Sequence, residues 1–375
     1  MALSEGKMTA NLENGVLVLE LSGRIDSNNV AQLESDIISE LAVMENVDVA
    51  FDALHLTYIS SAGLRVLLKV KKKLKKPVKI MNVTDEVFDI LEVTGFTEIL
   101  DVERIMRTIS IRGCKKISSA LNGEIFQLSE DEMIKVYGSD VTLDEIKKER
   151  SYAQTALVAG IPTLIPYDVV KTENGYGIVF EKVEMKSLAY VLAHEPQKMP
   201  ELADRFAEFM KELHTTEIMG NKLPDIKERY REWIEKLDNK DDSQTAMFSN
   251  IIASIPDSDM YVHGDINLNS VMVRDDEMLL MDMAGSAHGN SLFDLQGLFA
   301  SLVAIEKSDE GYCRRNYGVT SQICIAFWNA FFKKYMNNRE QEINSMNELL
   351  AKYYVLKQRI LLKLENKNNV FAENS

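Results

Sequence analysis

The stretch Tyr261–Asp294 carries three acidic side chains that a single phosphate-transfer site could use. Asp265 leads a polar turn into the short apolar strand Val271–Val273, and a second strand, Met278–Met281, ends on Asp282. Two strands separated by a short turn predict a hairpin, which would place both carboxylates at the same end of it. One carboxylate can then orient or deprotonate an attacking hydroxyl, while the other holds the magnesium ion that bridges nucleotide phosphates.

The order of polar residues in this stretch is more informative than any one of them. A lone His-Gly-Asp triplet, here beginning at His263, means little, because an Asp before a turn usually caps backbone N–H groups. The ordered set of triplet, strand, second Asp and later Asp294 resembles the catalytic core of the aminoglycoside phosphotransferase and choline kinase group, which has a protein-kinase fold. The resemblance implies that Asp265 is catalytic, that Asp282 binds the metal and that Asp294 is structural. Ser270 stands at the family's second metal position, where an Asn is usual.

Segments upstream follow the order of the smaller lobe of such a kinase. Residues Ile117–Leu128 resemble the strand–loop–strand that covers nucleotide phosphates, and Gly123 is the one glycine left in them. Lys135 lies alone among apolar residues of the next strand, and a buried lysine requires a partner. Glu149 in the following helix is predicted to be that partner. In an arbitrary sequence, a lysine whose head reaches solvent would be the default, but the order of these residues before the His-Gly-Asp triplet favours the ion pair.

The lobes are expected to meet at a hinge that includes Glu181 and Val183, where backbone groups would read adenine. Beyond Pro200 the pattern becomes helical, with apolar residues recurring at helical spacing from Leu202 to Leu213. His214 ends this helix and is predicted to pack or to cap its last turn.

Composition excludes several classes of function. The 375 residues allow two domains, and 43 basic against 58 acidic residues give a net charge of −15, which repels nucleic acid and anionic membranes. Three cysteines without CxxC spacing indicate neither a disulfide framework nor a zinc site. No apolar stretch approaches the roughly 20 residues that span a bilayer. We therefore expect a cytoplasmic protein without nucleic-acid or membrane partners.

The first hundred residues alternate between strand and helix patterns. Two alternating segments meet at Asn14-Gly15, a strong hairpin signal. A helix with apolar residues from Val30 to Leu41, a buried strand Val47–Phe51 and a helix Leu64–Leu74 follow. A further strand, Val78–Val83, and a further helix complete the alternation. The pattern predicts a mixed sheet covered by helices on one side.

Motifs at residues 21–26, 58–68 and 92–100 (LSGRID, YISSAGLRVLL and EVTGFTEIL) resemble a STAS domain of the anti-sigma factor antagonist type. The resemblance implies a phosphorylatable serine at the start of the central helix and a partner that is an anti-sigma factor or a related regulatory kinase. Alignment on Gly63 puts Ser61 at that position, with Ser60 as the alternative. A helix N-terminus has unpaired N–H groups that favour a phosphate, although both serines could merely cap the helix.

These observations predict an α/β protein with two domains. Residues 1–106 are expected to form the STAS domain, and residues 107–375 a two-lobed, aminoglycoside-phosphotransferase-like kinase domain whose lobes divide near residue 183. The first hypothesis is a signalling protein whose kinase domain uses ATP and Mg²⁺ to phosphorylate a hydroxyl acceptor. The second is a degenerate domain that only senses nucleotide beside an anti-sigma-factor-binding STAS module, and the third is a scaffold without catalysis.

Overall fold

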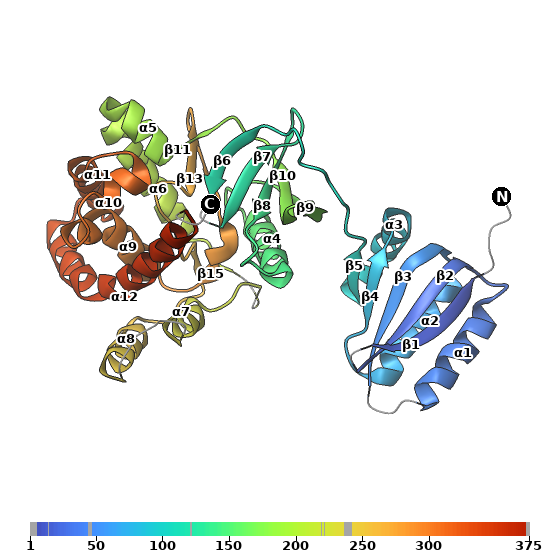
Figure 1. Cartoon of the computed structure of the whole chain (residues 1–375). Coiled ribbons are helices and arrows are strands. Elements are labelled where there is room, and N and C mark those ends of the chain that lie inside the picture. Colours follow the sequence, from blue (N-terminus) through green and yellow to red (C-terminus); the bar gives the residue numbers. More distant parts are fainter. Residues whose placement is uncertain are drawn as a thin grey trace. The chain divides into compact units, whose positions relative to one another are not determined.

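The computed structural model describes residues 6–13, 15–43, 47–120, 122–218, 220, 222–235 and 242–372. The chain divides into two compact units, Met1–Thr108 and Ile109–Ser375, each with its own five-stranded sheet (Figure 1). Asn14 of the predicted hairpin turn lies outside the described residues. In the part of the chain that is described, no helix is both long enough and apolar enough to cross a membrane.

The sheet of the first unit has its strands in sequence order. They are β1 (Lys7–Glu13), β2 (Val16–Ile25), β3 (Asp48–Ile59), β4 (Lys79–Val83) and β5 (Asp101–Arg104). The first pair is antiparallel and the other pairs are parallel, so the sheet is mixed, as predicted. Parallel neighbours need long crossovers, and helices α1 (Val30–Val43), α2 (Ser61–Leu74) and α3 (Asp85–Val93) supply them.

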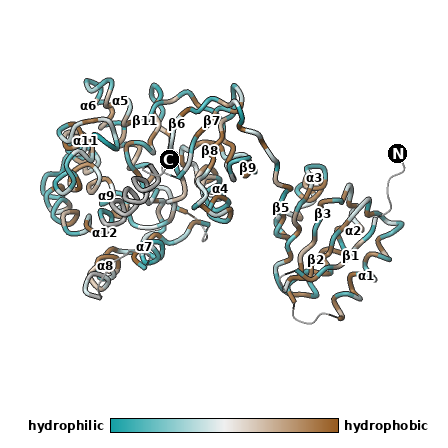
Figure 2. The backbone as a smooth tube through the Cα atoms, in the orientation of Figure 1, coloured by the Kyte–Doolittle hydropathy of each residue, from teal (hydrophilic) through white to brown (hydrophobic). Residues whose placement is uncertain are grey.

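One hydrophobic core holds this unit together. Leu19 and Phe51 of neighbouring strands pack with Ile37, Leu67 and Leu91, which come one from each helix. All three helices therefore cover the same face of the sheet, and the apolar inner strands are visible in Figure 2. The strand predicted over residues 47–51 is longer than expected, because β3 continues through further buried residues to Ile59.

The smaller lobe of the second unit is an antiparallel sheet with one helix. Its strands are β6 (Lys116–Ala120), β7 (Gly123–Gln127), β8 (Glu132–Tyr137), β9 (Pro166–Thr172) and β10 (Gly175–Glu181), in the order β6-β7-β8-β10-β9. Helix α4 (Leu143–Val158) begins at a capping box, in which the Thr142 hydroxyl accepts from the backbone N–H of Glu145 and the Glu145 carboxylate accepts from that of Thr142. The helix carries Glu149 towards β8.

The larger lobe is mostly helical and encloses the largest hydrophobic core among the described residues. Its helices are α5 (Leu188–His194), α6 (Met199–Leu213), α7 (Ile226–Glu235), α8 (Asp242–Ser254), α9 (Leu292–Phe299), a π-helix (Ala300–Ala304), α10 (Tyr312–Tyr317), α11 (Ser321–Tyr335) and α12 (Glu340–Ala372). Its short strands are β11 (Lys186–Ser187), β12 (Tyr261–Val262), β13 (Val271–Arg274), β14 (Glu277–Leu280) and β15 (Ala287–His288). The hairpin β13–β14 is tighter than predicted, since Arg274 pairs with Glu277.

Candidate functional site

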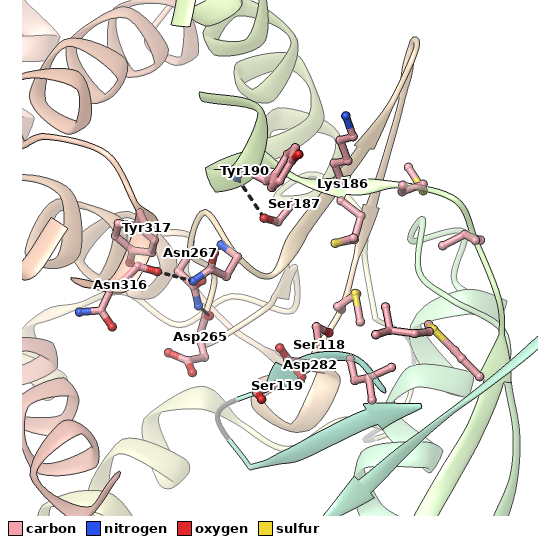
Figure 3. Close-up of a pocket in the computed structure, with 18 of the residues that line it drawn as sticks. Ser118, Ser119, Lys186, Ser187, Tyr190, Asp265, Asn267, Asp282, Asn316 and Tyr317 are labelled. Atoms are coloured by element: carbon pink, nitrogen blue, oxygen red, sulfur yellow. Dashed lines mark hydrogen bonds between the residues drawn. The ribbon is translucent and has the colours of Figure 1, made fainter. Parts of the chain in front are cut away.

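A cleft of about 810 Å³ lies between the two lobes of the second unit (Figure 3). The β6–β7 hairpin contributes Ser118 and Ser119 to its lining, and the segment from Lys182 to Ser187 contributes the connection between the lobes. Asp265 and Asp282 both line this cleft, from the ends of β12 and β14 that lead into and out of the β13 hairpin. The two carboxylates are thus brought to one cavity, as the hairpin pattern predicts.

Lys135 is held between two acidic side chains, one of which, Asp282, also lines the cleft. It is 4% exposed on β8, and its Nζ lies 3.0 Å from Glu149 Oε1 and 2.7 Å from Asp282 Oδ1. The predicted Lys135–Glu149 ion pair is therefore present. Burial by itself lowers the pKa of Lys135, but the two carboxylates outweigh burial and raise this pKa above its ordinary value. For Asp282 burial acts in the opposite direction and by itself raises the pKa. The attraction of Lys135 outweighs burial, so the pKa of Asp282 is lowered.

Asp282 reaches Lys135 from a strained backbone. Its φ of 59° and ψ of 56° are left-handed, a conformation that costs a typical L-residue roughly 1–2 kcal/mol and that Asp tolerates better than most. The strand before it is fixed because Met281 donates its N–H to the carbonyl of Ser270 over 2.8 Å. Such strain persists only where surrounding contacts enforce it, and it is common at functional sites.

Asp265 has a partner that the sequence did not reveal. Lys357, on α12, is 2% exposed, and its Nζ lies 2.7 Å from Asp265 Oδ1 and donates to the carbonyl of Gly264 over 3.0 Å. The ammonium also lies 5.1 Å from the ring centroid of Trp233, within cation–π range. The one signal for Lys357 is its spacing from Leu350 and Tyr354, which puts a charged residue in the apolar stripe of a helix.

Asp294 holds the backbone of the turn that leads to Asp265. Its carboxylate accepts the N–H of His263 at 2.8 Å and that of Gly264 at 2.7 Å. His214 Nε2 lies 3.2 Å from the same carboxylate, and His214 Nδ1 lies 2.9 Å from the hydroxyl of Tyr335. Burial raises the pKa of Asp294, but the hydrogen bonds and nearby histidines outweigh burial and lower it. His214, the C-cap of α6, therefore also connects that helix, through Asp294, to the turn that leads to Asp265.

Close packing of two glycines joins the turns that carry Asp265 and Asp282. A Cβ on Gly264 would lie 2.3 Å from the carbonyl oxygen of Gly285, and a Cβ on Gly285 would lie 2.5 Å from the carbonyl oxygen of His263. The imidazole of His263 adds a link, since its Nε2 lies 2.9 Å from the carbonyl of Met281. The two turns thus form one rigid support.

Not every residue predicted for the site reaches the cleft. Val183 lines it, whereas the Glu181 carboxylate accepts the backbone N–H of Ile165 at 2.8 Å. Gly123 lies at the start of β7, where a Cβ would meet the carbonyl oxygen of Val136 at 2.1 Å, so strand packing explains this glycine. The Ser270 hydroxyl is buried and makes turn hydrogen bonds with the backbone of Asn267, donating to its carbonyl and accepting from its N–H.

The residues present fit a magnesium nucleotide better than a resident metal ion. Among the described residues, no group of three or more His, Cys, Asp or Glu side chains is arranged to hold a metal. Mg²⁺ commonly uses one or two carboxylates together with substrate phosphates, and the Asp282 side chain is 38% exposed beside the cleft. Asp282 is therefore the residue that would hold Mg²⁺ together with the phosphates.

A second candidate site lies on the first unit, at the start of α2. Ser60 is the N-cap, and its hydroxyl accepts the N–H of Gly63 at 3.4 Å, a long hydrogen bond. Ser61 is the first helical residue and is exposed. Gly63 lets the helix approach the sheet closely, because a Cβ there would lie 2.7 Å from Ile59 and 2.8 Å from Ile25. The two serines thus have different surroundings.

The comparisons with known proteins separate along the same two units. Residues 7–110 match the STAS domain family. The putative anti-sigma factor antagonist BtrV of Bordetella bronchiseptica is 34% identical over 99 residues, which are 26% of this chain and 84% of BtrV. An aminoglycoside-3'-phosphotransferase of type VIII is 15% identical, with a TM-score of 0.46, and the similarity covers 66% of this chain and 94% of that one. A choline/ethanolamine kinase family protein from Mesorhizobium loti is 14% identical, with a TM-score of 0.39, over 66% and 87% of the two chains. Through its first unit, the chain belongs to the STAS-domain family of anti-sigma factor antagonists.

Proposed function

We propose that the second unit is an ATP-dependent phosphotransferase that acts on a hydroxyl acceptor. The observation that carries this proposal is the buried Lys135, held by Glu149 and by Asp282, which lines the same cleft as Asp265. A lysine fixed by a helix glutamate beside a metal-binding aspartate is the arrangement that kinases use to hold nucleotide phosphates.

Each side chain has a defined task in this proposal. Lys135 binds phosphate oxygens, while Glu149 keeps its ammonium in place. Asp265 accepts a hydrogen bond from the acceptor hydroxyl and takes its proton as a new P–O bond forms. The bond between the γ-phosphorus and the bridging oxygen breaks, and ADP leaves. Mg²⁺, bound with Asp282, would neutralise charge on the phosphates.

For the first unit we propose a phosphorylation-dependent switch that binds an anti-sigma factor or a related regulatory kinase. The supporting observation is that Ser61 is exposed at a helix N-terminus while Ser60 makes the cap. A phosphate on Ser61 would add about −1.5 to −2 charge at a protein surface, which is enough to form or break a contact.

The described cysteines are unpaired, which supports a location in the reducing cytoplasm.

Calorimetric titration of the full chain with ATP, with and without Mg²⁺, tests the nucleotide site. We expect magnesium-dependent binding that Asp282→Ala weakens and that Asp276→Ala leaves unchanged, because Asp276 is exposed in the turn of the same hairpin. The absence of heat at millimolar nucleotide would contradict the proposal and favour a scaffold. Binding without any ATP turnover would favour the nucleotide-sensing alternative.

A further inference from the structure

The catalytic carboxylate of the proposed site already has a cationic partner from within the chain. The Lys357 ammonium lies 2.7 Å from Asp265 Oδ1, and the stem of this lysine passes Gly297, where an added Cβ would lie 3.6 Å from it. No hydrogen bond to Asp265 Oδ2 is found among the described residues, which leaves this oxygen for an acceptor hydroxyl.

The other charged side chains around the cleft do not give it an excess of negative charge that would attract a cationic acceptor. Of the described residues that line the cleft, five are lysines and three are carboxylates, namely Glu184, Asp265 and Asp282. The half-buried Arg229 donates to the carbonyls of Ala284 and Ser286, and its positive charge lies near both Asp265 and the exposed Glu232. Lys116 is paired with Glu124, which does not line the cleft, but lysines still outnumber carboxylates among the described lining residues.

The remaining polar residues on the helical side of the cleft are neutral. They are Ser187, Tyr190, Asn267, Asn269, Ser301, Tyr312, Asn316 and Tyr317. Amides, hydroxyls and aromatic faces bind hydroxyl groups and the apolar faces of polyols, and they have no full charge to offer an ammonium ion.

We propose that the acceptor is a hydroxyl compound without a cationic group, of the polyol class, and that Lys357 sets this preference. The inference rests on the proposed phosphotransferase function. A cationic group placed against Asp265 would lie within a few ångströms of the Lys357 ammonium in a partly enclosed cleft, where repulsion between like charges is strong. A neutral hydroxyl needs only a hydrogen-bond acceptor, and Asp265 supplies it.

Matched acceptors that differ in charge test this inference. Phosphate transfer from radiolabelled ATP by the full chain would be measured to choline and its neutral analogue 3,3-dimethylbutan-1-ol, and to glucosamine and glucose. We expect kcat/KM to be at least about tenfold higher for the neutral member of each pair, because two like charges a few ångströms apart in a cleft repel each other by more than about 1.4 kcal/mol. Lys357→Met, which keeps the stem but removes the charge, should abolish this ratio.

Two further variants separate charge from folding. Lys357→Arg keeps the charge and should keep the neutral preference, and Lys352→Met, at an exposed position of the same helix, should match the unmodified chain. Three outcomes would overturn this inference and leave the proposed function standing. They are a preference for the cationic members, a ratio unchanged by Lys357→Met, and transfer to none of the four acceptors by a protein that hydrolyses ATP. Failure to bind ATP in the calorimetric titration would instead remove the proposed function, and this inference with it.

Discussion

At the scale of single residues, the candidate site consists of charges that are already paired. The sequence predicts the Lys135–Glu149 pair because both residues lie in adjacent elements of one lobe, 14 positions apart. Lys357 could not be predicted in the same way, since nothing local marks its contact with Asp265 far earlier in the chain. Short-range order reveals which residue types are present, whereas long-range packing determines which of them meet.

Asp294→Asn should destabilise the second unit. The carboxylate accepts two backbone N–H groups and faces His214 in a fully buried position, while an amide has one oxygen and directs N–H groups at donors. We expect the free energy of unfolding to fall by about 2–4 kcal/mol. Urea unfolding followed by tryptophan fluorescence measures this selectively, because both tryptophans, Trp233 and Trp328, belong to the second unit.

The same carboxylate predicts a pH dependence. Because the folded protein lowers the pKa of Asp294, its contribution to stability is complete above the unfolded pKa of about 3.9 and is lost as pH falls through the lower folded value. The difference in stability between the unmodified chain and Asp294→Asn should therefore shrink below about pH 4. A difference that stays constant with falling pH would show that the charge of Asp294 is not what stabilises the turn.

Ser270→Asn should raise ATP turnover. Position 270 lies next to the strand end that carries Asp282, because the carbonyl of Ser270 accepts the N–H of Met281. An amide oxygen at this position would be a better magnesium ligand than the serine hydroxyl. The rate of ADP release at saturating Mg²⁺ provides the measurement. Ser270→Ala, which removes the hydroxyl without adding an amide, is the control and should not accelerate turnover. An unchanged rate in Ser270→Asn would indicate that the buried turn cannot present the amide to the cleft.

At the scale of elements, order was more predictable than extent. Alternating and helical periodicities identify the strand and helix sequence of the first unit, yet β3 runs eight residues past its predicted end at Phe51, from Asp52 to Ile59. Leu54 is exposed there whereas Leu56 and Ile59 are buried, so the spacing of the buried residues is irregular in this part of the strand. Pairing with β2 extends the strand, and local composition does not contain that information.

The contact between the turns carrying Asp265 and Asp282 leads to a prediction about two glycines. Gly264→Ala combines a positive φ of 77° with a Cβ 2.3 Å from the backbone of Gly285, and it should cost about 2–4 kcal/mol of stability and abolish nucleotide binding. Gly160→Ala has a similar φ of 87° but open space around the Cβ. It should cost only about 1 kcal/mol and retain binding. Tryptophan-detected unfolding and calorimetry compare the two, and equal effects would contradict a role for close packing.

At the scale of the whole molecule, the chain joins a STAS domain to a two-lobed unit with a cleft, for which we propose phosphate transfer. The motifs of both units lie in contiguous stretches, which is why the sequence could indicate them separately. The cationic balance of the cleft could not be predicted from a chain with a net charge of −15, because it results from lysines that distant elements bring together. Lysines therefore outnumber carboxylates along the cleft, although acidic residues outnumber basic ones in the chain as a whole.

The last prediction concerns Ser61, which we expect to accept phosphate and to control partner binding. Ser61 is exposed at the first helical position, where backbone N–H groups favour a phosphate, and Ser60 is engaged as the cap. Ser61→Ala should abolish phosphorylation while Ser35→Ala, at an exposed serine of α1, leaves it intact. Ser60→Ala should instead lower stability by about 1 kcal/mol, as loss of an N-cap does.

Mass spectrometry of protein from its native cells would identify the modified residue. The same measurement after incubation with ATP and Mg²⁺ alone would show whether the second unit supplies the phosphate or a separate kinase is needed. Phosphate on Ser60 with none on Ser61 would contradict the assignment, and phosphate on neither would leave both serines with a capping role only.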